Sequence, residues 1–288
     1  MYFESKILNV KLRKAKIHYI PDVVYSQVPT FEKPLQALQM DILLPQSNTL
    51  LPAVIFVTGG GFISSNRARC PQLRMRLAEA GYFVGSINYR TAPNSKFPEP
   101  IEDVKAAIHF VKANARRFNV DAEKISLIGD SAGGYLTSFV AVTNDKSSDK
   151  IVAAVDLYGV SDLTKVADDF NDAVKTQYNS AGSMSSLFVN GMSGLTGRGG
   201  SILHNEKVAV TNPINYVNKN SAPMLLMHGT ADRVVSPSQT DLLFQALKNV
   251  GVDAERYVIP NADHSDDFWV QDEVFDVIVK FLNRYSVK

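Results

Sequence analysis

The sequence predicts an α/β protein with a mostly parallel central sheet, antiparallel strands at its N-terminal edge and helices on both faces. The first observation is a set of short, continuous β-branched and aromatic runs, such as PAVIFVTGG (52–60), which are typical of strands buried on both faces. The second is that helix-like stretches alternate with these runs. The third is that 288 residues with 45% hydrophobic side chains can fill one large core. We therefore expect residues 1–288 to form a single domain.

The predicted elements follow each other along the chain. From Lys6 to about Leu44, apolar residues alternate in runs broken by prolines, which suits antiparallel edge strands. Buried strands are expected at 52–60, 82–89, 124–129, 151–159, 223–229 and 255–260, and helices at 72–80, 101–118, 132–143, 239–250 and 272–285. Residues 162–215 contain no buried-strand run and include the Gly- and Ser-rich stretch 191–201, so we expect a cap or loop insertion there.

Composition excludes several classes of partner. Thirty Lys and Arg against 29 Asp and Glu give a formal charge of +1, so no long-range field favours nucleic acid or an anionic membrane. Cys70 is the only cysteine and cannot form an internal disulfide, which fits a reducing compartment. Glu4 and Lys6 interrupt the place where a signal peptide needs its apolar core, and no apolar run is long enough to span a membrane. We expect a cytoplasmic protein with a small-molecule substrate, with homo-oligomer formation left open.

The one G-x-S-x-G motif of the chain is Gly129-Asp130-Ser131-Ala132-Gly133. It directly follows a predicted buried strand and opens a predicted helix, the setting in which a strained turn raises a serine hydroxyl above the sheet. The flanking glycines fit because such a sharp turn leaves no room for a Cβ. The motif predicts that Ser131 is a nucleophile. The alternative is a Gly-rich turn in which Ser131 only caps the helix.

A serine nucleophile needs a base, usually a histidine, and the chain has five histidines. His18 lies in an expected edge strand, and His109 is expected to pack inside a helix. His204 lies in the insertion, where it could contact substrate, and His228 is expected to brace the turn after its strand. His264 lies on a polar loop directly after the last predicted strand, and we predict that it is the base.

Asp232 occupies the corresponding loop after the preceding strand. Carboxyl ends of parallel strands meet at one edge of the sheet, where ligands bind, so Ser131, Asp232 and His264 are expected to converge there. Their order along the chain is that of the α/β-hydrolase triad. Asp263, Asp266 and Asp267 are rival partners for His264, ranked lower because neighbours in a loop need not point toward one another.

The stretch TGGGF (58–62) follows the first of these buried strands, where backbone N–H groups could stabilise a developing oxyanion. Gly60 and Gly61 are the candidate donors there, together with the N–H of Ala132 after the serine. The alternative, a phosphate-binding loop, is weak because the G-x-G-x-x-G spacing and the G-K-[ST] ending are lacking. Acyl transfer by these groups needs no metal and no organic cofactor.

TGGGF, NYRTAPNSKFP, GDSAGGYL and HGTADRVV together resemble, in order and approximate spacing, the α/β-hydrolase serine esterases. The similarity is greatest to carboxylesterases of the hormone-sensitive-lipase-like and feruloyl/acetyl-esterase-like groups, and it covers about residues 38–285. It implies the α/β-hydrolase fold, with Ser131 as nucleophile, His264 as base, Asp232 as its partner and Gly60, Gly61 and Ala132 as oxyanion donors.

Two features of single residues also follow from the resemblance. The family usually has histidine where this chain has Thr58, at the start of the stretch 58–62, which we call the glycine loop. The rigidity of this loop is therefore an open question, although its backbone donors remain. The resemblance also implies a structural ion pair between Arg90 and Asp103.

The sequence therefore predicts serine-dependent hydrolysis of small carboxylic esters through an acyl-enzyme, including acetylated or aromatic-acid esters of carbohydrates. Phe62 and Phe188 are the candidate substrate-binding residues, and core or cap packing is the alternative explanation for them. Further candidates to line the substrate pocket are Phe170, Tyr178 and Leu187. An arylformamidase and a non-catalytic ligand-binding homologue remain as alternatives, whereas a peptidase would normally need an additional domain.

Overall fold

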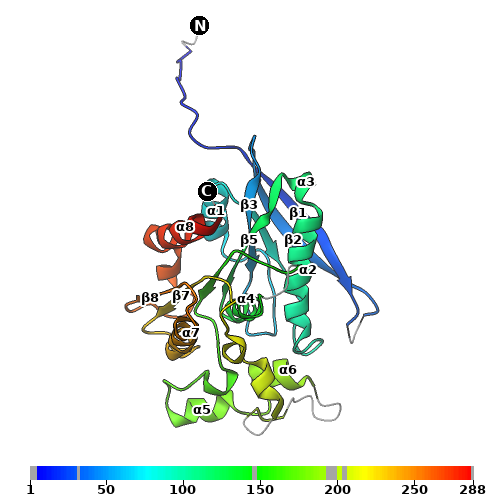
Figure 1. Ribbon diagram of the computed structural model, residues 1–288, viewed down its shortest axis with the longest axis vertical. Helices are drawn as coiled ribbons and strands as arrows, with labels where there is room; N and C mark the ends of the chain where they lie inside the picture. The colour runs from blue at the N-terminus through cyan, green and yellow to red at the C-terminus, as the bar shows by residue number, and fades with distance from the viewer. Residues whose placement is uncertain (1–4, 31–32, 145–147, 193–199, 203–205, 287–288) are drawn as a thin grey trace.

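A single eight-stranded sheet organises the molecule (Figure 1). The computed structural model describes residues 5–30, 33–144, 148–192, 200–202 and 206–286. The strand order is β1-β2-β4-β3-β5-β6-β7-β8, in which β1, β2 and β4 pair antiparallel and all later pairs are parallel. The predicted mostly parallel sheet with an antiparallel N-terminal edge is confirmed.

The described strands and helices agree closely with the sequence patterns. The strands are β1 (Ile17–Val28), β2 (Gln36–Pro45), β3 (Leu51–Val57), β4 (Phe83–Ile87), β5 (Val120–Asp130), β6 (Ala153–Leu157), β7 (Met224–Gly229) and β8 (Ala254–Ile259). The α-helices are α1 (Pro71–Glu79), α2 (Glu99–Ala113), α3 (Ala115–Phe118), α4 (Ala132–Val142), α5 (Asp172–Tyr178), α6 (Met184–Asn190), α7 (Ser238–Asn249) and α8 (Asp272–Ser286). None of these helices is long and apolar enough to cross a lipid bilayer.

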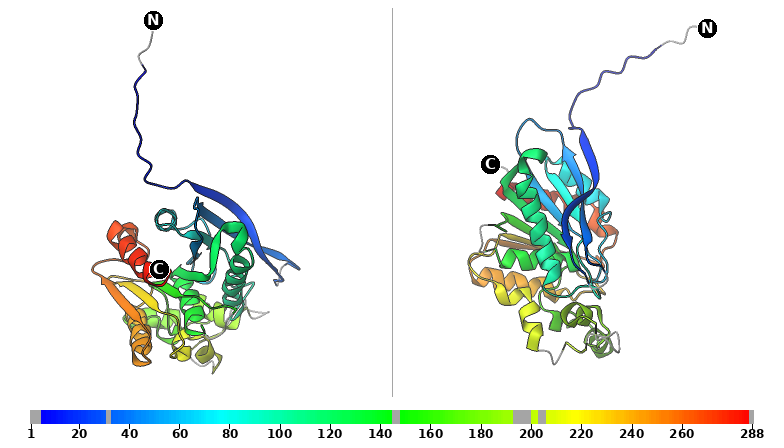
Figure 2. Two further views of the ribbon diagram at one scale, coloured as in Figure 1. Left: turned by 45° about the horizontal axis from the view of Figure 1, so that its top comes forward. Right: turned by 90° about the vertical axis from the view of Figure 1, so that its right-hand side faces the viewer.

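Helices cover both faces of the sheet, as predicted (Figure 2). Helices α1 and α8 pack on one face, where Leu77 and Ile278 join a buried cluster with Phe56 and Val155 of the sheet. Helices α2, α4 and α7 pack on the other face, against a larger cluster. Because the central strands are buried on both faces, each needs apolar side chains on either side. This requirement explains their unbroken hydrophobic runs.

The described part of the predicted insertion, 162–215, adds no strand to the sheet and instead carries α5, α6 and short 3₁₀ helices. These elements lie beyond the helical layer at the end opposite the N-terminus (Figure 1). They are tied to the body by backbone contacts, such as the N–H of Phe97 donating to the carbonyl of Phe188. Most of the Gly- and Ser-rich stretch 191–201 lies outside the described residues.

Two expected element boundaries are wrong. Residues 6–16 are not part of a strand, because β2 ends at Pro45, which pairs with Ile17, so the chain before Ile17 has no partner strand. The expected helix 101–118 is divided into α2 and α3 at Asn114, whose side-chain amide donates to the carbonyl of Phe110. An Asn side chain that binds the local backbone competes with helical hydrogen bonding.

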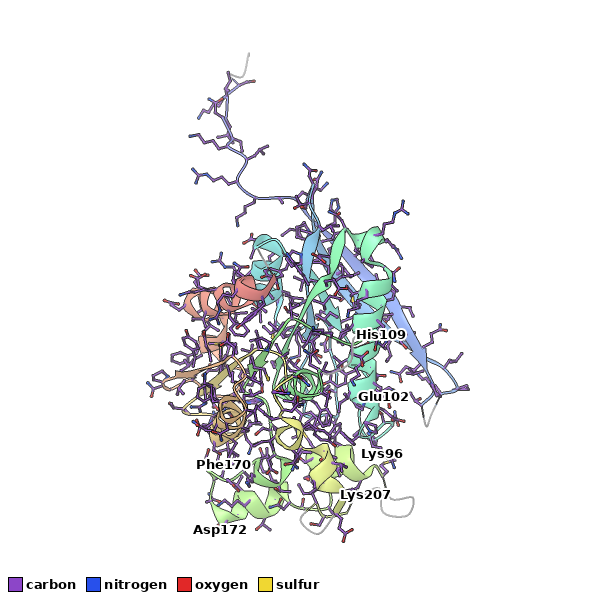
Figure 3. All side chains as sticks on the ribbon, viewed as in Figure 1. Lys96, Glu102, His109, Phe170, Asp172 and Lys207 are labelled. Carbon is purple, nitrogen blue, oxygen red and sulfur yellow. The ribbon has the colours of Figure 1, made fainter. Side chains whose placement is uncertain are left out.

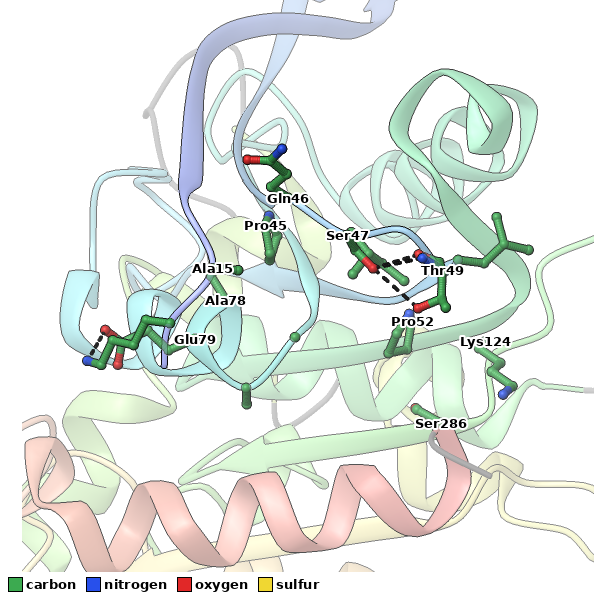
Figure 4. A pocket seen from close by; sticks show the side chains of 15 residues that line it. Ala15, Pro45, Gln46, Ser47, Thr49, Pro52, Ala78, Glu79, Lys124 and Ser286 are labelled. Carbon is green, nitrogen blue, oxygen red and sulfur yellow. Dashed lines mark hydrogen bonds and ion pairs between the residues drawn. The ribbon is translucent and has the colours of Figure 1, made fainter. Parts of the chain in front are cut away.

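A cavity of about 530 Å³ lies at the amino ends of the parallel strands (Figure 4). Pro52 at the start of β3, Lys124 in the first half of β5 and Ser286 at the end of α8 line it. Ligands of open α/β sheets bind at the carboxyl ends of the strands. This cavity is therefore at the wrong edge of the sheet for the predicted chemistry.

The expected ion pair between Arg90 and Asp103 is present and buried. The Arg90 guanidinium donates to both carboxylate oxygens of Asp103, with Nη2 to Oδ1 at 2.8 Å, and the Arg90 backbone N–H donates to Oδ2 at 2.8 Å. Asp103 lies on α2, so the pair ties the chain after β4 to this helix. Removal of one partner of a buried pair leaves an uncompensated charge.

Exchange of Arg90 for alanine is predicted to destabilise the fold by about 3 to 5 kcal/mol and to lower the melting temperature by roughly 10 °C. The loss of ester turnover per folded molecule, expressed as a free energy of activation, should be smaller than this loss of unfolding free energy, since Arg90 only supports the fold. Calorimetry and active-fraction assays measure the two effects, with Arg116→Ala, on the exposed side of α3, as the control. A large loss of turnover at unchanged melting temperature would contradict this assignment.

Asp156 is a carboxylic acid within the central strand β6. Its oxygens accept from the Ser138 hydroxyl and from the Gly159 N–H, each at 2.8 Å. Burial raises the pKa of Asp156 to about 6, and the two hydrogen bonds limit the rise. The folded protein therefore favours the protonated acid more than the unfolded chain does.

Because this pKa is raised on folding, ionisation of Asp156 should cost stability as pH rises from about 4 to 6, by about 3 kcal/mol. Asp156→Asn keeps an acceptor for Gly159 and does not ionise. The free energy of unfolding of wild type minus that of D156N should thus fall between pH 4 and 6 and level off above. Urea unfolding at several pH values measures the difference, and a flat difference would refute the prediction.

Candidate active site

Ser131 lies on a sharp turn between β5 and α4. Its backbone has φ 54° and ψ −120°, a strained conformation for a residue other than glycine, and its side chain makes no helix-capping hydrogen bond. A Cβ at Gly129 would collide with the backbone of Gly133, and a Cβ at Gly133 would collide with the carbonyl of Val57. The structure therefore has the strained strand-to-helix turn that the motif predicts, and the capping alternative is not supported.

The three predicted triad residues come together at the carboxyl edge of the sheet. His264, after β8, lies with Nε2 at 2.9 Å from Ser131 Oγ and Nδ1 at 2.8 Å from Asp232 Oδ2. Asp232 follows β7, which pairs in parallel with β8, so neighbouring strand ends supply the acid and the histidine. In this arrangement the imidazole can take the serine proton while the carboxylate orients the ring.

Asp232 is held as a carboxylate by the groups around it. Burial alone would raise its pKa, but hydrogen bonds from His228 and His264 and from the N–H of Val235 hold the pKa well below its usual range. The N–H of Val234 also donates to Oδ1, at 2.8 Å. The side chain is fully buried, so its charge faces the imidazole with little solvent screening.

The rival carboxylates near His264 are engaged elsewhere. Asp263 accepts from the backbone N–H and guanidinium of Arg233 and from the N–H of His264 itself. Asp266 accepts from the N–H of Phe268 at the start of a 3₁₀ helix (Asp267–Val270), and the Asp267 residue is exposed. Only Asp232 contacts Nδ1 among these acids, in agreement with the ranking made from the sequence.

Two other histidines have structural contacts. His228 is buried, with Nε2 at 3.1 Å from the Val235 carbonyl, and so braces the loop that carries Asp232. The expectation that His109 is packed is wrong: this residue lies on α2 (Figure 3), its side chain is 51% exposed, and it pairs with Asp149. The buried residues of α2 lie on the opposite side of the helix, so position 109 faces outward.

His18 is exposed on β1, and His204 lies outside the described residues. A metal site was not expected from the sequence. Within the described ranges, no three His, Cys, Asp or Glu side chains are grouped so that they could hold a metal ion.

The loop that carries the predicted oxyanion donors Gly60 and Gly61 begins next to the serine. An added Cβ at Gly59 would stand 3.1 Å from Ser131 Cβ, so the start of the glycine loop contacts the nucleophile turn. Gly61 has φ +60° and Gly60 φ +150°, both in the range that favours glycine. Across the described part of the chain, the N–H groups of Gly60, Gly61 and Ala132 have no acceptor, which leaves them available to a ligand oxygen.

Thr58 is fully buried, and other groups brace the loop that follows it. The Tyr89 hydroxyl donates to the Thr58 carbonyl at 2.7 Å, and the Tyr89 N–H donates to the Ser65 hydroxyl at 3.0 Å. Ser65 Oγ also lies 3.5 Å from Thr58 Oγ1. Tyr89 therefore holds the glycine loop at its first residue, Thr58, and at Ser65, three residues beyond its last residue, without a histidine at position 58.

The two predicted substrate-binding aromatics pack on each other. The rings of Phe62 and Phe188 are stacked at 4.3 Å between centroids, and Tyr135 contacts both edge-on. Phe188 has no exposed surface, and Phe62 is only 5% exposed. The prediction that Phe188 contacts a ligand directly is therefore wrong for this conformation. The alternative of cap packing applies, because α6 seals its aromatic face against the glycine loop.

Sequence reasoning missed Tyr158, which contacts the histidine from beside the sheet. Its ring lies 4.7 Å from the His264 ring and 4.4 Å from Trp269, and its backbone has φ 46°. Tyr158 directly follows β6, so a buried aromatic at the carboxyl edge of a predicted strand was the only available signal. It restricts the imidazole plane by packing.

Comparison with known proteins shows that the chain is similar to esterases. The chain is 30% identical to Esterase LipQ of Mycobacterium tuberculosis over 227 residues, which cover 75% of this chain and 50% of that protein. It is 28% identical to isoprenylcysteine alpha-carbonyl methylesterase ICME of Arabidopsis thaliana over 265 residues, 85% of this chain and 59% of that protein. The chain spans about half the length of the curated relatives it matches.

The fold and the family follow from two further matches. A solved structure described as a truncated form of carbohydrate esterase from gut microbiota superposes with a TM-score of 0.80 at 25% identity, and covers 96% of this chain and 98% of that one. The predicted α/β-hydrolase fold is thereby confirmed. The BD-FAE family model matches residues 40–247, well over half of the sequence. The chain therefore belongs to the BD-FAE family of α/β-hydrolase esterases.

Proposed function

We propose that this protein hydrolyses carboxylic esters through a covalent acyl-enzyme on Ser131. The observation that carries the proposal is the continuous hydrogen-bonded path from Ser131 Oγ through the imidazole of His264 to Asp232. Activation of a serine by an oriented histidine is the requirement for nucleophilic acyl transfer. The named relatives support the same reaction class, since they are described as esterases.

The first half of the reaction acylates the serine. His264 Nε2 takes the Ser131 proton as Oγ bonds to the ester carbonyl carbon, and the carbonyl electron pair moves to its oxygen. The N–H groups of Gly60, Gly61 and Ala132 donate to that oxyanion. As the oxyanion collapses, the bond to the alcohol oxygen breaks and His264 returns the proton to the leaving alcohol.

The second half releases the acid. Water attacks the acyl carbonyl while His264 Nε2 accepts a water proton, and the same donors hold the second oxyanion. Ser131 Oγ then leaves with that proton. Asp232 stays ionised throughout, because its hydrogen bonds hold its pKa well below the usual carboxylate range, and it stabilises each imidazolium.

The proposed substrates are small esters with a short acyl group, including acetylated carbohydrates. Met184, at the start of α6, lies so close to Gly61 that a Cβ there would collide with its Sδ. Phe62, the last residue of the same loop, is buried. In this proposal residues 162–215 act as a cap over a single domain, and Met184 limits acyl length beside the oxyanion donors.

The proposed working environment is the cytoplasm. A single cysteine supports this, since Cys70 cannot pair within the chain. Burial raises the pKa of the Cys70 thiol to about 12, so it stays protonated and is a poor nucleophile.

Ser131→Ala is predicted to lower turnover of p-nitrophenyl acetate by more than a thousandfold, because the nucleophile is lost. Wild type should form a fluorophosphonate adduct on Ser131, seen by mass spectrometry. Ser47→Ala, beside the distant cavity, is the control and should retain full activity. An intact wild type that forms no adduct would favour the ligand-binding alternative, and faster turnover of an N-formyl aromatic amine than of the ester would favour an arylformamidase.

Met184→Ala is predicted to raise kcat/KM for p-nitrophenyl hexanoate relative to the acetate by at least about tenfold, since room for even one more methylene is worth roughly 1 kcal/mol or more. Met192→Ala is the matched control, because Met192 is an exposed methionine of the same insertion. Equal ratios for the two variants would show that Met184 does not limit acyl length.

A further inference from the structure

Arg69 connects two of the loops that meet at the proposed active site. It lies in the segment between β3 and α1, and its Nη2 is 3.3 Å from Asp130 Oδ2 and 3.3 Å from Ser265 Oγ. Asp130 immediately precedes Ser131, and Ser265 immediately follows His264. One guanidinium nitrogen therefore joins the nucleophile turn to the loop that carries the base.

Asp130 extends this connection to the oxyanion loop. Its side chain is fully buried, and Oδ1 accepts from the Gly59 N–H at 2.7 Å. Burial raises the pKa of Asp130, while the Arg69 charge and the Gly59 N–H oppose the rise. The carboxylate thus contacts the glycine loop through one oxygen and Arg69 through the other.

The placement of Arg69 depends on these two contacts. Its Nε is buried without an acceptor among the described residues, so Nη2 carries the side chain's interactions with the site. Ser265 has φ +59° and Asn261 φ +63°, so the loop around His264 is a tight, strained turn. A displacement of about 1 Å in such a loop is enough to lower turnover strongly.

We propose that Arg69 is a positioning residue that holds His264 in line with Ser131 by tying Ser265 to Asp130. This inference rests on the proposed function. Arg69 does not contact the reacting atoms; it acts through the geometry of the His264–Ser131 hydrogen bond. Its loss lowers kcat and leaves KM for a small ester unchanged, because the chemical step needs the alignment more than binding does.

Arg67 provides a matched control in the same loop. Its guanidinium donates to Asp41 at 2.7 Å and to Asp22, and so ties this loop to β2 and to the turn within β1. A role in loop stability alone would make the two arginines equivalent. The positioning role requires that only Arg69 affects the chemical step.

The experiment compares Arg69→Gln, Arg67→Gln and Ser265→Ala for melting temperature and for kcat and KM with p-nitrophenyl acetate. R69Q should lower kcat by at least tenfold at unchanged KM, and S265A by about threefold to tenfold, as expected for loss of one hydrogen bond. R67Q should keep kcat within twofold of the wild-type value, even if its melting temperature falls as far as that of R69Q. Arg69→Lys should recover part of the loss by restoring the positive charge beside Asp130.

A double variant tests whether Arg69 and Ser265 act together. R69Q/S265A should lose no more kcat than R69Q alone, because both substitutions break the same connection. Equal kcat losses in R69Q and R67Q, or full additivity in the double variant, would overturn the proposal. Ser265 is exposed, so S265A should fold. If R69Q does not fold, the kcat of S265A decides the question alone.

A crystal structure of R69Q or S265A separates this inference from the proposed reaction. The distance from His264 Nε2 to Ser131 Oγ, 2.9 Å in the wild type, should exceed hydrogen-bonding range or the His264 ring should be disordered. An unchanged contact would refute the positioning role whether or not the protein hydrolyses esters. Absence of ester turnover and of a fluorophosphonate adduct in wild type would refute the proposed function instead.

Discussion

The close approach of β3 and β5 at their carboxyl ends is the constraint on which the site depends. The two strands are neighbours in parallel register, with Val57 opposite Gly129, so the glycine loop and the nucleophile turn leave the sheet side by side. A Cβ at Gly133 would meet the carbonyl of Val57, and one at Gly59 would meet Asp130 at 2.7 Å. Only glycine at these positions lets the glycine loop and the nucleophile turn approach each other this closely.

Buried carboxylates at this edge differ because their partners differ. Asp232 accepts from two histidines and two backbone N–H groups, and these donors outweigh burial. Asp156 has one hydroxyl and one N–H donor, and burial outweighs them. Burial also raises the pKa of Asp130, although a cation and an N–H oppose the rise. The balance between desolvation and hydrogen-bond donors, rather than the residue type, decides whether the pKa of each carboxylate is raised or lowered.

The insertion contacts the loops at the carboxyl edge of the sheet. Helix α6 brings Phe188 onto Phe62 and Met184 onto Gly61, so residues far apart in the chain pack against the glycine loop. Tyr178 of α5 contributes by donating its hydroxyl to the carbonyl of Val234, in the loop that carries Asp232. The sheet and its loops support the common chemistry of the fold, and these insertion contacts are where substrate preference can vary.

The amino-acid sequence by itself determined the buried strands, the α/β class, the strained turn at Ser131 and the order of Ser131, Asp232 and His264, because these depend on local composition and on the rule that parallel strands end at one edge. Only the tertiary structure decided that Phe188 is sealed from ligand, that His109 faces solvent and that Asp263 is occupied by Arg233. It also decided that Arg69 joins Asp130 to Ser265. Such contacts join segments up to 196 positions apart, and no periodicity or motif spacing encodes which side chains meet across that separation.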